Sequence, residues 1–237
     1  MRTPRSLQVP LPARPLPYSA PAGETDTWDG CSVADASVDD PSKIVLIYSG
    51  YEIEPGPRDR EYAEAGWTRE HVWPRSRARG GMDTDSPGLG TDLHNLFAAD
   101  QSVNSARRNK HLAAIPEGEF VVDQSPMGGS DGRLEAKTSR EAWEPPDRSK
   151  GIVARAALYV ACAYPDRARL VEGVGGGRPG ELGNLTDILD WNKRFLPGPR
   201  ERRRNDAVEA LQGNRNPFID DPSLADAVDF SAGQDKE

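Results

Sequence analysis

Cysteine is scarce in this chain, and long apolar runs are absent. The two cysteines among 237 residues, Cys31 and Cys162, lie far apart and form no CxxC pair, which argues against a zinc site built from thiolates. We predict two unpaired thiols, with a single disulfide as the alternative for an exported protein. No stretch approaches the length of a membrane span, so we expect no membrane partner.

The N-terminal residues also lack the pattern of a secretory leader. Residues 1–30 are rich in proline and contain no continuous apolar segment of the kind that a signal peptide needs. We therefore expect a cytoplasmic protein, with secretion as the alternative if a leader is missing from the sequence.

The chain has no surplus of basic charge. Its formal net charge of −8 at pH 7 at face value opposes binding to nucleic acid. The acids crowd into residues 24–64 and the end after Asp220, whereas basic residues concentrate at 69–79, 107–110 and 193–204. This distribution predicts a locally basic face that contacts phosphates, with weak long-range attraction.

Composition divides the chain into three parts. Recurrent prolines followed by acids predict a disordered N-terminal arm over residues 1–42. An ordered domain is expected over residues 43–222, and an acidic tail over residues 223–237.

Within the domain, the spacing of apolar residues predicts short strands first and then mostly helices. The predicted strands are residues 43–49, 67–72 and 92–97. The predicted helices are residues 99–109, capped by Asp100, and residues 148–163, 183–194 and 199–212. This order indicates an α+β fold rather than a doubly wound sheet.

Histidine is rare, which draws attention to the stretch WTREHVWP. His71 is one of only three histidines, and Glu70 precedes it directly. A neutral imidazole near pH 7 can take a proton from water, so His71 is the candidate general base. The alternative is a structural histidine at a strand end. On a regular strand Glu70 and His71 would leave on opposite faces, so a shared site requires a bulge or a strand end.

Two oxygen-bearing side chains are candidate metal ligands. The carboxylate of Glu70 is a hard ligand that suits Mg²⁺, which keeps several waters and needs only one or two protein groups. Asn104, inside a predicted helix, offers an amide oxygen. The alternatives are a surface glutamate paired with Arg69 or Arg75, and an ordinary exposed asparagine.

Other polar residues near these candidates receive supporting roles. For the set Asp92, His94 and Asn95 we favour structural roles. Arginine suits a phosphate, and one close arginine can stabilise charge that develops at phosphorus, for which Arg107 is the candidate. The remaining candidate contacts to nucleic acid are Arg69, Arg75, Arg79, Arg108 and Lys110. The arginine run at 200–204 is interpreted as a solvated helix face.

Seven blocks in order resemble the endonuclease I family of His-Me finger (ββα-metal) nucleases. The blocks are KIVLIYSG, WTREHVWPRS, GTDLHNL, VNSARRNK, DRSKGIVARAALYV, LGNLTDILDW and RRRNDAVEALQGNRNPFID, between Lys43 and Pro222. The resemblance implies a two-stranded finger followed by a helix, with further helices around it. It also implies that His71 is the general base, and that Glu70 and Asn104 hold one magnesium-class ion, with Mn²⁺ or Ca²⁺ as alternatives.

The resemblance further implies a largely nonspecific endonuclease that cuts DNA, or RNA as well, through backbone contacts. The chain departs from the family pattern at Phe97-Ala98, where many relatives carry an arginine-proline pair, and at Arg108, where relatives often have a small residue. These departures motivate a rival hypothesis, a catalytically silent module that binds nucleic acid or protein. A nuclease kept in the cytoplasm would also need control, which makes an inhibitor protein a further predicted partner.

Overall fold

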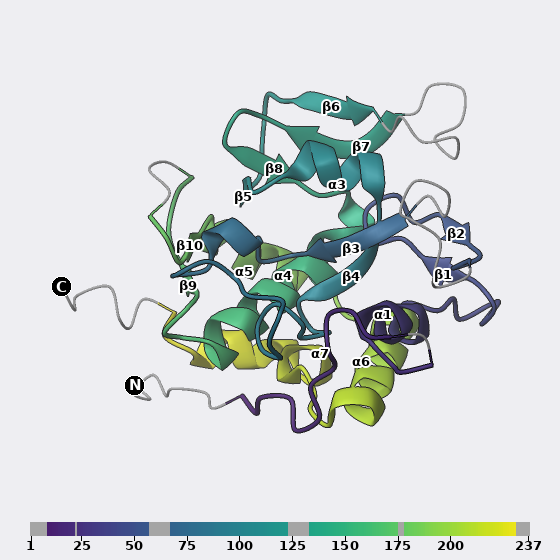
Figure 1. Cartoon of the computed structure of the whole chain (residues 1–237). Helices are drawn as coiled ribbons and strands as arrows, with labels where there is room; N and C mark the ends of the chain where they lie inside the picture. Colours follow the sequence, from purple (N-terminus) through teal and green to yellow (C-terminus); the bar gives the residue numbers. More distant parts are fainter. Residues whose placement is uncertain (1–8, 22, 57–66, 123–132, 175–177, 231–237) are drawn as a thin grey trace.

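Short strands and helices of mixed order form an α+β structure (Figure 1). The computed structural model describes residues 9–21, 23–56, 67–122, 133–174 and 178–230. Its helices are α1 (Thr27–Ala34), η1 (Arg75–Arg77), α3 (Gln101–Arg107), α4 (Asp147–Ala163), α5 (Leu185–Arg194), α6 (Pro199–Gln212), α7 (Pro217–Asp220) and η2 (Pro222–Ala227). Its strands are β1 (Ile44–Val45), β2 (Glu52–Ile53), β3 (Trp67–His71), β4 (Leu96–Asp100), β5 (His111–Leu112), β6 (Glu119–Val122), β7 (Arg133–Thr138), β8 (Ala142–Glu144), β9 (Arg169–Leu170) and β10 (Glu181–Leu182).

A strand pair followed by a helix lies at the centre of the molecule (Figure 1). Strands β3 and β4 pair antiparallel, and their register runs from Trp67 opposite Asp100 to His71 opposite Leu96. The Asp100 side chain then caps α3 by accepting hydrogen bonds from two backbone N–H groups of its first turn, as predicted. Helix α3 packs against both strands.

The predicted strand at residues 92–97 is displaced toward the C-terminus. Residues 92–95 form a turn, and pairing begins only at Leu96. The reason is that the backbone N–H groups of Asn95 and Leu96 donate to the carbonyl of Asp92 at 2.9 Å and 3.0 Å, which closes a turn. The predicted strand at 43–49 is likewise reduced to the two residues of β1.

A four-stranded sheet in the order β5-β8-β7-β6 packs beside α3 (Figure 1). Sequence patterns did not predict this sheet, because most of its strands are only two to four residues long. Trp143 of β8 is fully buried and anchors the sheet in the main core, together with Leu134 and Ala136 of β7.

Helices α4 and α5 form the core on the other side of the strand pair. Both were predicted, and α4 is buried along most of its length. Gly151 permits the close approach of the two helices, because a Cβ at this position would lie 2.1 Å from the carbonyl oxygen of Phe195. Among the described segments, no helix is both long and apolar enough to cross a membrane.

Helix α6 spans the predicted residues, but of its arginines only Arg202 is exposed as a solvated face requires. Arg204 is buried and donates to the Asp35 carboxylate at 2.7 Å. Arg200 donates to the Val45 carbonyl at 2.7 Å, and Arg203 donates to the Ala36 carbonyl at 3.1 Å. These arginines therefore bind the residues after α1 and the strand β1 to α6.

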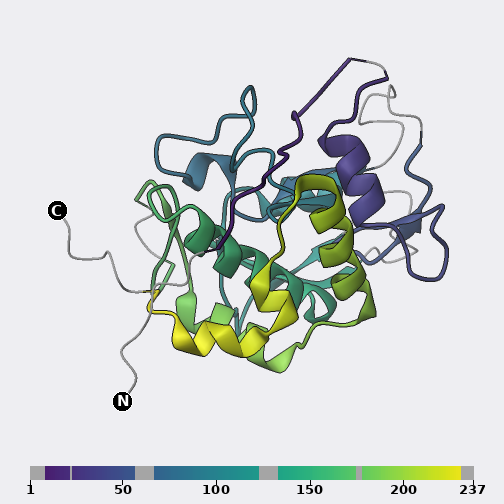
Figure 2. The same ribbon diagram turned by 90° about the horizontal axis from the view of Figure 1, so that it is seen from below.

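The described part of the predicted disordered arm is ordered in the structure. Asp26 and Asp29 form a capping box at the start of α1, and Cys31 on that helix is fully buried. Helix α1 lies beside α6 in both views (Figures 1 and 2). Polar and proline-rich composition suggested disorder here, but contacts with α6 order the segment. Cys31 and Cys162 are both free, as predicted.

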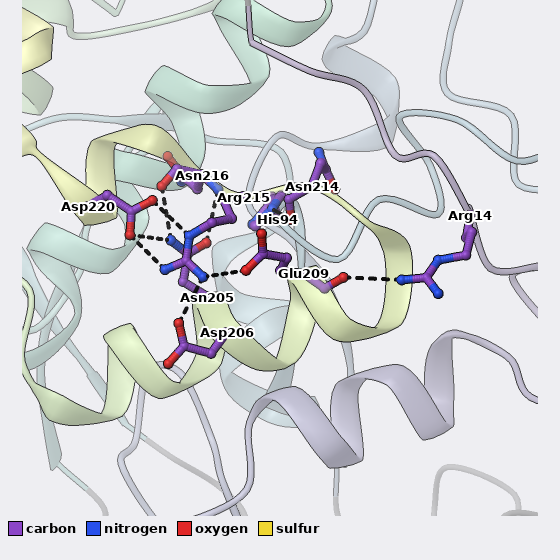
Figure 3. A network of polar contacts seen from close by, with 9 residues as sticks. All are labelled: Arg14, His94, Asn205, Asp206, Glu209, Asn214, Arg215, Asn216 and Asp220. Carbon is purple, nitrogen blue, oxygen red and sulfur yellow. Dashed lines mark hydrogen bonds and ion pairs between the residues drawn. The ribbon is translucent and has the colours of Figure 1, made fainter.

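Polar contacts join the C-terminal part of the chain to the N-terminal segment (Figure 3). Arg215 forms ion pairs with Asp206, Glu209 and Asp220 at 2.7–2.8 Å. Nearby, Arg14 donates to the carbonyl of Ala210 at 3.0 Å, which ties residues 9–21 to the end of α6. The network therefore holds both ends of the described chain against one side of the core.

Candidate active site

Glu70 is a buried carboxylate held by two side chains. It lies on β3 with only 2% of its surface exposed. The hydroxyl of Tyr48 donates to Glu70 Oε1 at 2.7 Å, and Arg107 Nε lies 3.4 Å from the same oxygen as an ion pair that lacks hydrogen-bond geometry. Burial raises the pKa of Glu70, whereas Arg107 and Tyr48 act in the opposite direction.

His71 is held by a backbone carbonyl. Its Nε2 lies 2.9 Å from the carbonyl oxygen of Gly90. Because a carbonyl oxygen can only accept, Nε2 carries the proton, and in the neutral ring Nδ1 keeps its lone pair. The ring of Tyr18 stacks on the imidazole at 5.9 Å between centroids and 18° between planes.

The electrostatic surroundings keep this imidazole neutral. Burial lowers the pKa of His71 to about 4, and the nearby cations of Arg75, Arg69 and Arg107 contribute in the same direction. The hydrogen bond to Gly90 raises the pKa but does not offset burial. At neutral pH the ring is therefore a base rather than a cation.

Glu70 and His71 leave β3 in different directions, as expected of neighbours on a strand. Arg69 and His71 share the Tyr18 side, where the Arg69 guanidinium lies 3.5 Å from the Tyr18 ring centroid. Glu70 points to Tyr48 and to Arg107 of α3. Both candidates lie at the C-terminal end of β3, where the chain turns away into a loop.

Asn104 lies on the helix that covers this strand end. It precedes Arg107 by three residues on α3, so both side chains leave the same side of the helix. Arg107 reaches the carboxylate of Glu70, whereas Asn104 is only half-buried. Among the described residues, no hydrogen bond occupies the Asn104 amide, which leaves its oxygen available to a ligand.

Arg107 takes an interior position that differs from the phosphate contact expected of it. Its side chain is 1% exposed. The guanidinium donates to the carbonyl of His71 at 3.3 Å, to that of Arg108 at 3.0 Å, and to that of Val72. With its donors directed at backbone carbonyls, this group supports the strand end.

Asp92, His94 and Asn95 are buried and join separate segments. Asp92 accepts hydrogen bonds from Tyr159 at 2.7 Å and from Tyr164 at 2.9 Å. His94 Nε2 lies 3.2 Å from the carbonyl oxygen of Asn214. These contacts connect the turn at 92–95 to α4 and to the segment after α6.

Asn95 has the most direct link to the candidate base. Its Oδ1 accepts from the backbone N–H of Trp73 at 2.7 Å, and its Nδ2 donates to the carbonyl of Leu89 at 3.4 Å. Trp73 follows His71 by two residues, and Leu89 precedes Gly90. Asn95 therefore holds the two chain segments between which the His71–Gly90 hydrogen bond forms.

The five predicted nucleic-acid contacts divide by exposure. Arg75, Arg79 and Arg108 are exposed, and Lys110 is half-buried with its amine on the carbonyl of Ala106 at 3.1 Å. Arg69 is different, because it is 4% exposed and lies between the rings of Tyr18 and Trp28. Arg75 is the exposed cation whose charge acts most strongly on His71.

The donor set suits a hard cation with few protein ligands. Among the described residues, no group of three or more His, Cys, Asp or Glu side chains could hold a metal ion. Glu70 is a buried carboxylate with one partly compensating cation, and Asn104 offers an amide oxygen on the same helix as that cation, Arg107. One or two such oxygens are what Mg²⁺ needs when waters complete its shell.

Sequence reasoning identified the candidate base and ligands but missed the groups that hold them. Tyr48 lies in the apolar stretch KIVLIYS and has the signal of a core residue. Gly90 acts through its carbonyl, which no sequence pattern reveals. Tyr18 lies in the segment that we predicted to be disordered.

Comparison with known proteins identifies the family of this chain. The family model of Endonuclease I matches residues 18–223. The chain is 34% identical over 212 residues to an extracellular ribonuclease of Bacillus amyloliquefaciens, across 86% of this chain and 67% of that protein. A second extracellular ribonuclease, from Bacillus subtilis (strain 168), matches at the same identity and coverage.

A shorter match reaches a protein with a different named substrate. The chain is 29% identical over 129 residues to an extracellular deoxyribonuclease of Aeromonas hydrophila, across 54% of this chain and 49% of that protein. The match to the family model spans most of the chain and includes the segments that contribute Tyr18, Glu70, His71 and Asn104. The chain therefore belongs to the endonuclease I family.

Proposed function

We propose that this protein is a metal-dependent, largely nonspecific endonuclease that hydrolyses phosphodiester bonds. The observation that carries the proposal is the hydrogen bond from His71 Nε2 to the carbonyl of Gly90, beside the held carboxylate of Glu70. It leaves Nδ1 as a basic nitrogen of fixed orientation next to a candidate metal ligand. Strands β3 and β4 and helix α3 then form the ββα-metal core of the family.

The chemical step begins with the base. His71 Nδ1 takes a proton from water while the water oxygen forms a bond to phosphorus. The bond from phosphorus to the leaving sugar oxygen breaks, and that oxygen receives a proton from solvent. The lowered pKa of His71 keeps the ring unprotonated at neutral pH, so the base is ready before the substrate arrives.

Glu70 and Asn104 would hold one divalent cation, with Mg²⁺ as the expected ion. When bound, the ion supplies positive charge that stabilises the phosphate and the leaving oxygen. The chain's own contribution is to bury Glu70 as a carboxylate oriented by Tyr48 and Arg107. Burial without full compensation favours the binding of a further cation at this carboxylate.

Arg75 replaces Arg107 as our candidate for the phosphate contact. It is exposed and lies near His71, whereas Arg107 is buried. Arg79 and Arg108 extend the exposed cations around the site. Contacts of this kind bind the backbone and not the bases, which fits substrates of either DNA or RNA.

Relatives named for ribonuclease and deoxyribonuclease activity support both substrate classes. The same relatives are named as extracellular, so we propose that this protein is secreted, in place of the cytoplasmic location first expected.

Cleavage of supercoiled plasmid and of single-stranded RNA tests the proposal. The purified protein is incubated with Mg²⁺ or with EDTA, beside His71→Ala. We expect cleavage only with metal, and a loss of roughly 10²–10⁴ in kcat for His71→Ala, the usual contribution of a general base. Wild-type rates in His71→Ala would contradict the assignment of the base. Binding without cleavage under Mg²⁺ and Mn²⁺ would favour a catalytically silent module.

His94→Ala is the matched control. His94 is also buried and also bonded through Nε2 to a backbone carbonyl, and burial lowers its pKa to about 4 as well. Unlike His71, it does not follow a glutamate in the sequence. We expect this variant to lose stability while its folded fraction keeps the wild-type kcat.

A further inference from the structure

Tyr48 makes a contact that its place in the apolar core does not explain. The residue lies in the stretch after β1, is fully buried, and packs its ring edge-on against Trp143 at 5.4 Å between centroids. Phenylalanine would fill this space equally well. The hydroxyl is instead bonded to Glu70 Oε1 at 2.7 Å.

Helix α4 holds the segment that carries Tyr48 through hydrogen bonds to its backbone. Arg148 donates to the carbonyl of Ser49 at 2.8 Å, and the hydroxyl of Ser149 donates to the carbonyl of Ile47. The backbone on both sides of Tyr48 is thus bonded to the first turn of α4. With the ring also held by Trp143, the hydroxyl has a defined position.

Both side-chain contacts to Glu70 fall on one oxygen. Tyr48 and Arg107 approach Oε1, and among the described residues no side chain is bonded to Oε2. A carboxylate with one oxygen engaged by two groups cannot rotate freely about its last bond, so the direction of Oε2 is set as well.

The two partners differ in charge, and this difference matters for a cation. Arg107 favours the ionised carboxylate but repels a second cation nearby. The phenol of Tyr48 is a neutral donor to the same oxygen. It orients the carboxylate without adding positive charge.

We propose that Tyr48 is a positioning residue for cation binding, which acts by orienting Glu70 so that Oε2 faces a divalent metal ion. The inference rests on the proposed function, since it assigns Glu70 as a metal ligand. Groups that hydrogen-bond a metal ligand commonly change metal affinity by 10- to 100-fold when removed. Tyr48 would therefore determine the metal concentration at which the enzyme works.

Tyr48→Phe tests this inference, because it removes one oxygen atom and keeps the ring. Mn²⁺ binding to the protein without substrate is followed by the loss of the free-ion electron paramagnetic resonance signal. We expect the Kd for Mn²⁺ to rise about tenfold. The Mg²⁺ concentration that gives half-maximal cleavage should rise by a similar factor, while kcat at saturating Mg²⁺ changes little.

Tyr164→Phe is the matched control. Tyr164 donates to the buried carboxylate of Asp92 at 2.9 Å, so its substitution removes the same kind of hydrogen bond away from Glu70. It should lower Tm without any change in the Kd for Mn²⁺. Thermal unfolding of both variants verifies that the proteins compared are folded.

The outcomes separate the two proposals. If wild type binds Mn²⁺ and cleaves, and Tyr48→Phe binds Mn²⁺ with an unchanged Kd, the positioning role is refuted while the proposed function stands. If wild type neither binds Mn²⁺ nor cleaves nucleic acid, both proposals fail. An equal rise in Kd for Tyr48→Phe and Tyr164→Phe would also refute the inference, since the effect would then not be specific to Glu70.

Discussion

Replacement of Arg107 by alanine should lower the stability of the fold more than it weakens binding of a substrate. The guanidinium is buried against the Glu70 carboxylate and the carbonyls of His71, Val72 and Arg108. Its removal leaves Glu70 as a buried charge without its cation, which costs roughly 3–5 kcal/mol. A domain's free energy of unfolding is only about 5–15 kcal/mol, so the loss is a large fraction of the total.

Urea unfolding followed by tryptophan fluorescence measures this loss. With a urea dependence of roughly 2–3 kcal/mol per molar, the midpoint for Arg107→Ala should fall by about 1–2 M. The control is Arg79→Ala, an exposed arginine whose removal should change stability by no more than about 0.5 kcal/mol. In the Arg107→Ala background, Glu70→Gln should restore part of the stability, because it removes the unpaired charge.

A different outcome would contradict the interior assignment of Arg107. If Arg107→Ala unfolds at the wild-type midpoint and loses only affinity for nucleic acid, the interior assignment is refuted. Arg107 would then be the phosphate contact expected from sequence.

Three further predictions concern pH, geometry and salt. Burial lowers the pKa of His94 from 6.5 to about 4. The unfolded state therefore binds more protons between these values, and His94 alone should contribute a loss of stability of roughly 3 kcal/mol as the pH falls through that window; a flat urea midpoint from pH 7 to 4 would contradict this. Gly90→Ala should lower kcat roughly 10- to 100-fold, because its Cβ would lie 2.0 Å from the carbonyl oxygen of Asp83 and the Gly90–His71 bond must shift; steady-state kinetics of the folded variant checks it. Arg215→Ala should lower Tm by roughly 2–4 °C at low salt and by much less in 1 M salt, since its ion pairs are partly exposed; calorimetry at both salt concentrations decides.

Periodic segments of the fold were predictable, and segments ordered by distant contacts were not. Helix α6 and the cap of α3 by Asp100 agree with their predictions, because local signals specify them. The sheet around β7 depends on pairing between segments with weak alternation. Helix α1 is ordered by Arg204 and Arg203 of α6, more than 160 residues later, an influence that local composition does not contain.

The candidate site shows the same division. Glu70 and His71 are adjacent in sequence, so their chemistry could be recognised there. The orientation of each depends on a residue distant in sequence: Tyr48 lies 22 residues before Glu70, and Gly90 lies 19 residues after His71. Arg107 was predicted to contact the phosphate because the planar group of arginine suits a phosphate. Its burial follows from carbonyls that the turn after β3 leaves without backbone partners.

Because its ion pairs are buried, the stability of the fold should depend on salt much less than the binding of a substrate does. Arg155 with Glu201 and Arg204 with Asp35 are both nearly inaccessible to solvent, so mobile ions screen them little. Under the proposed function, exposed cations such as Arg75 would contact the phosphates of nucleic acid, and such contacts weaken steeply as salt rises. At high salt the protein should therefore release nucleic acid and remain folded. Dilution alone should then restore binding.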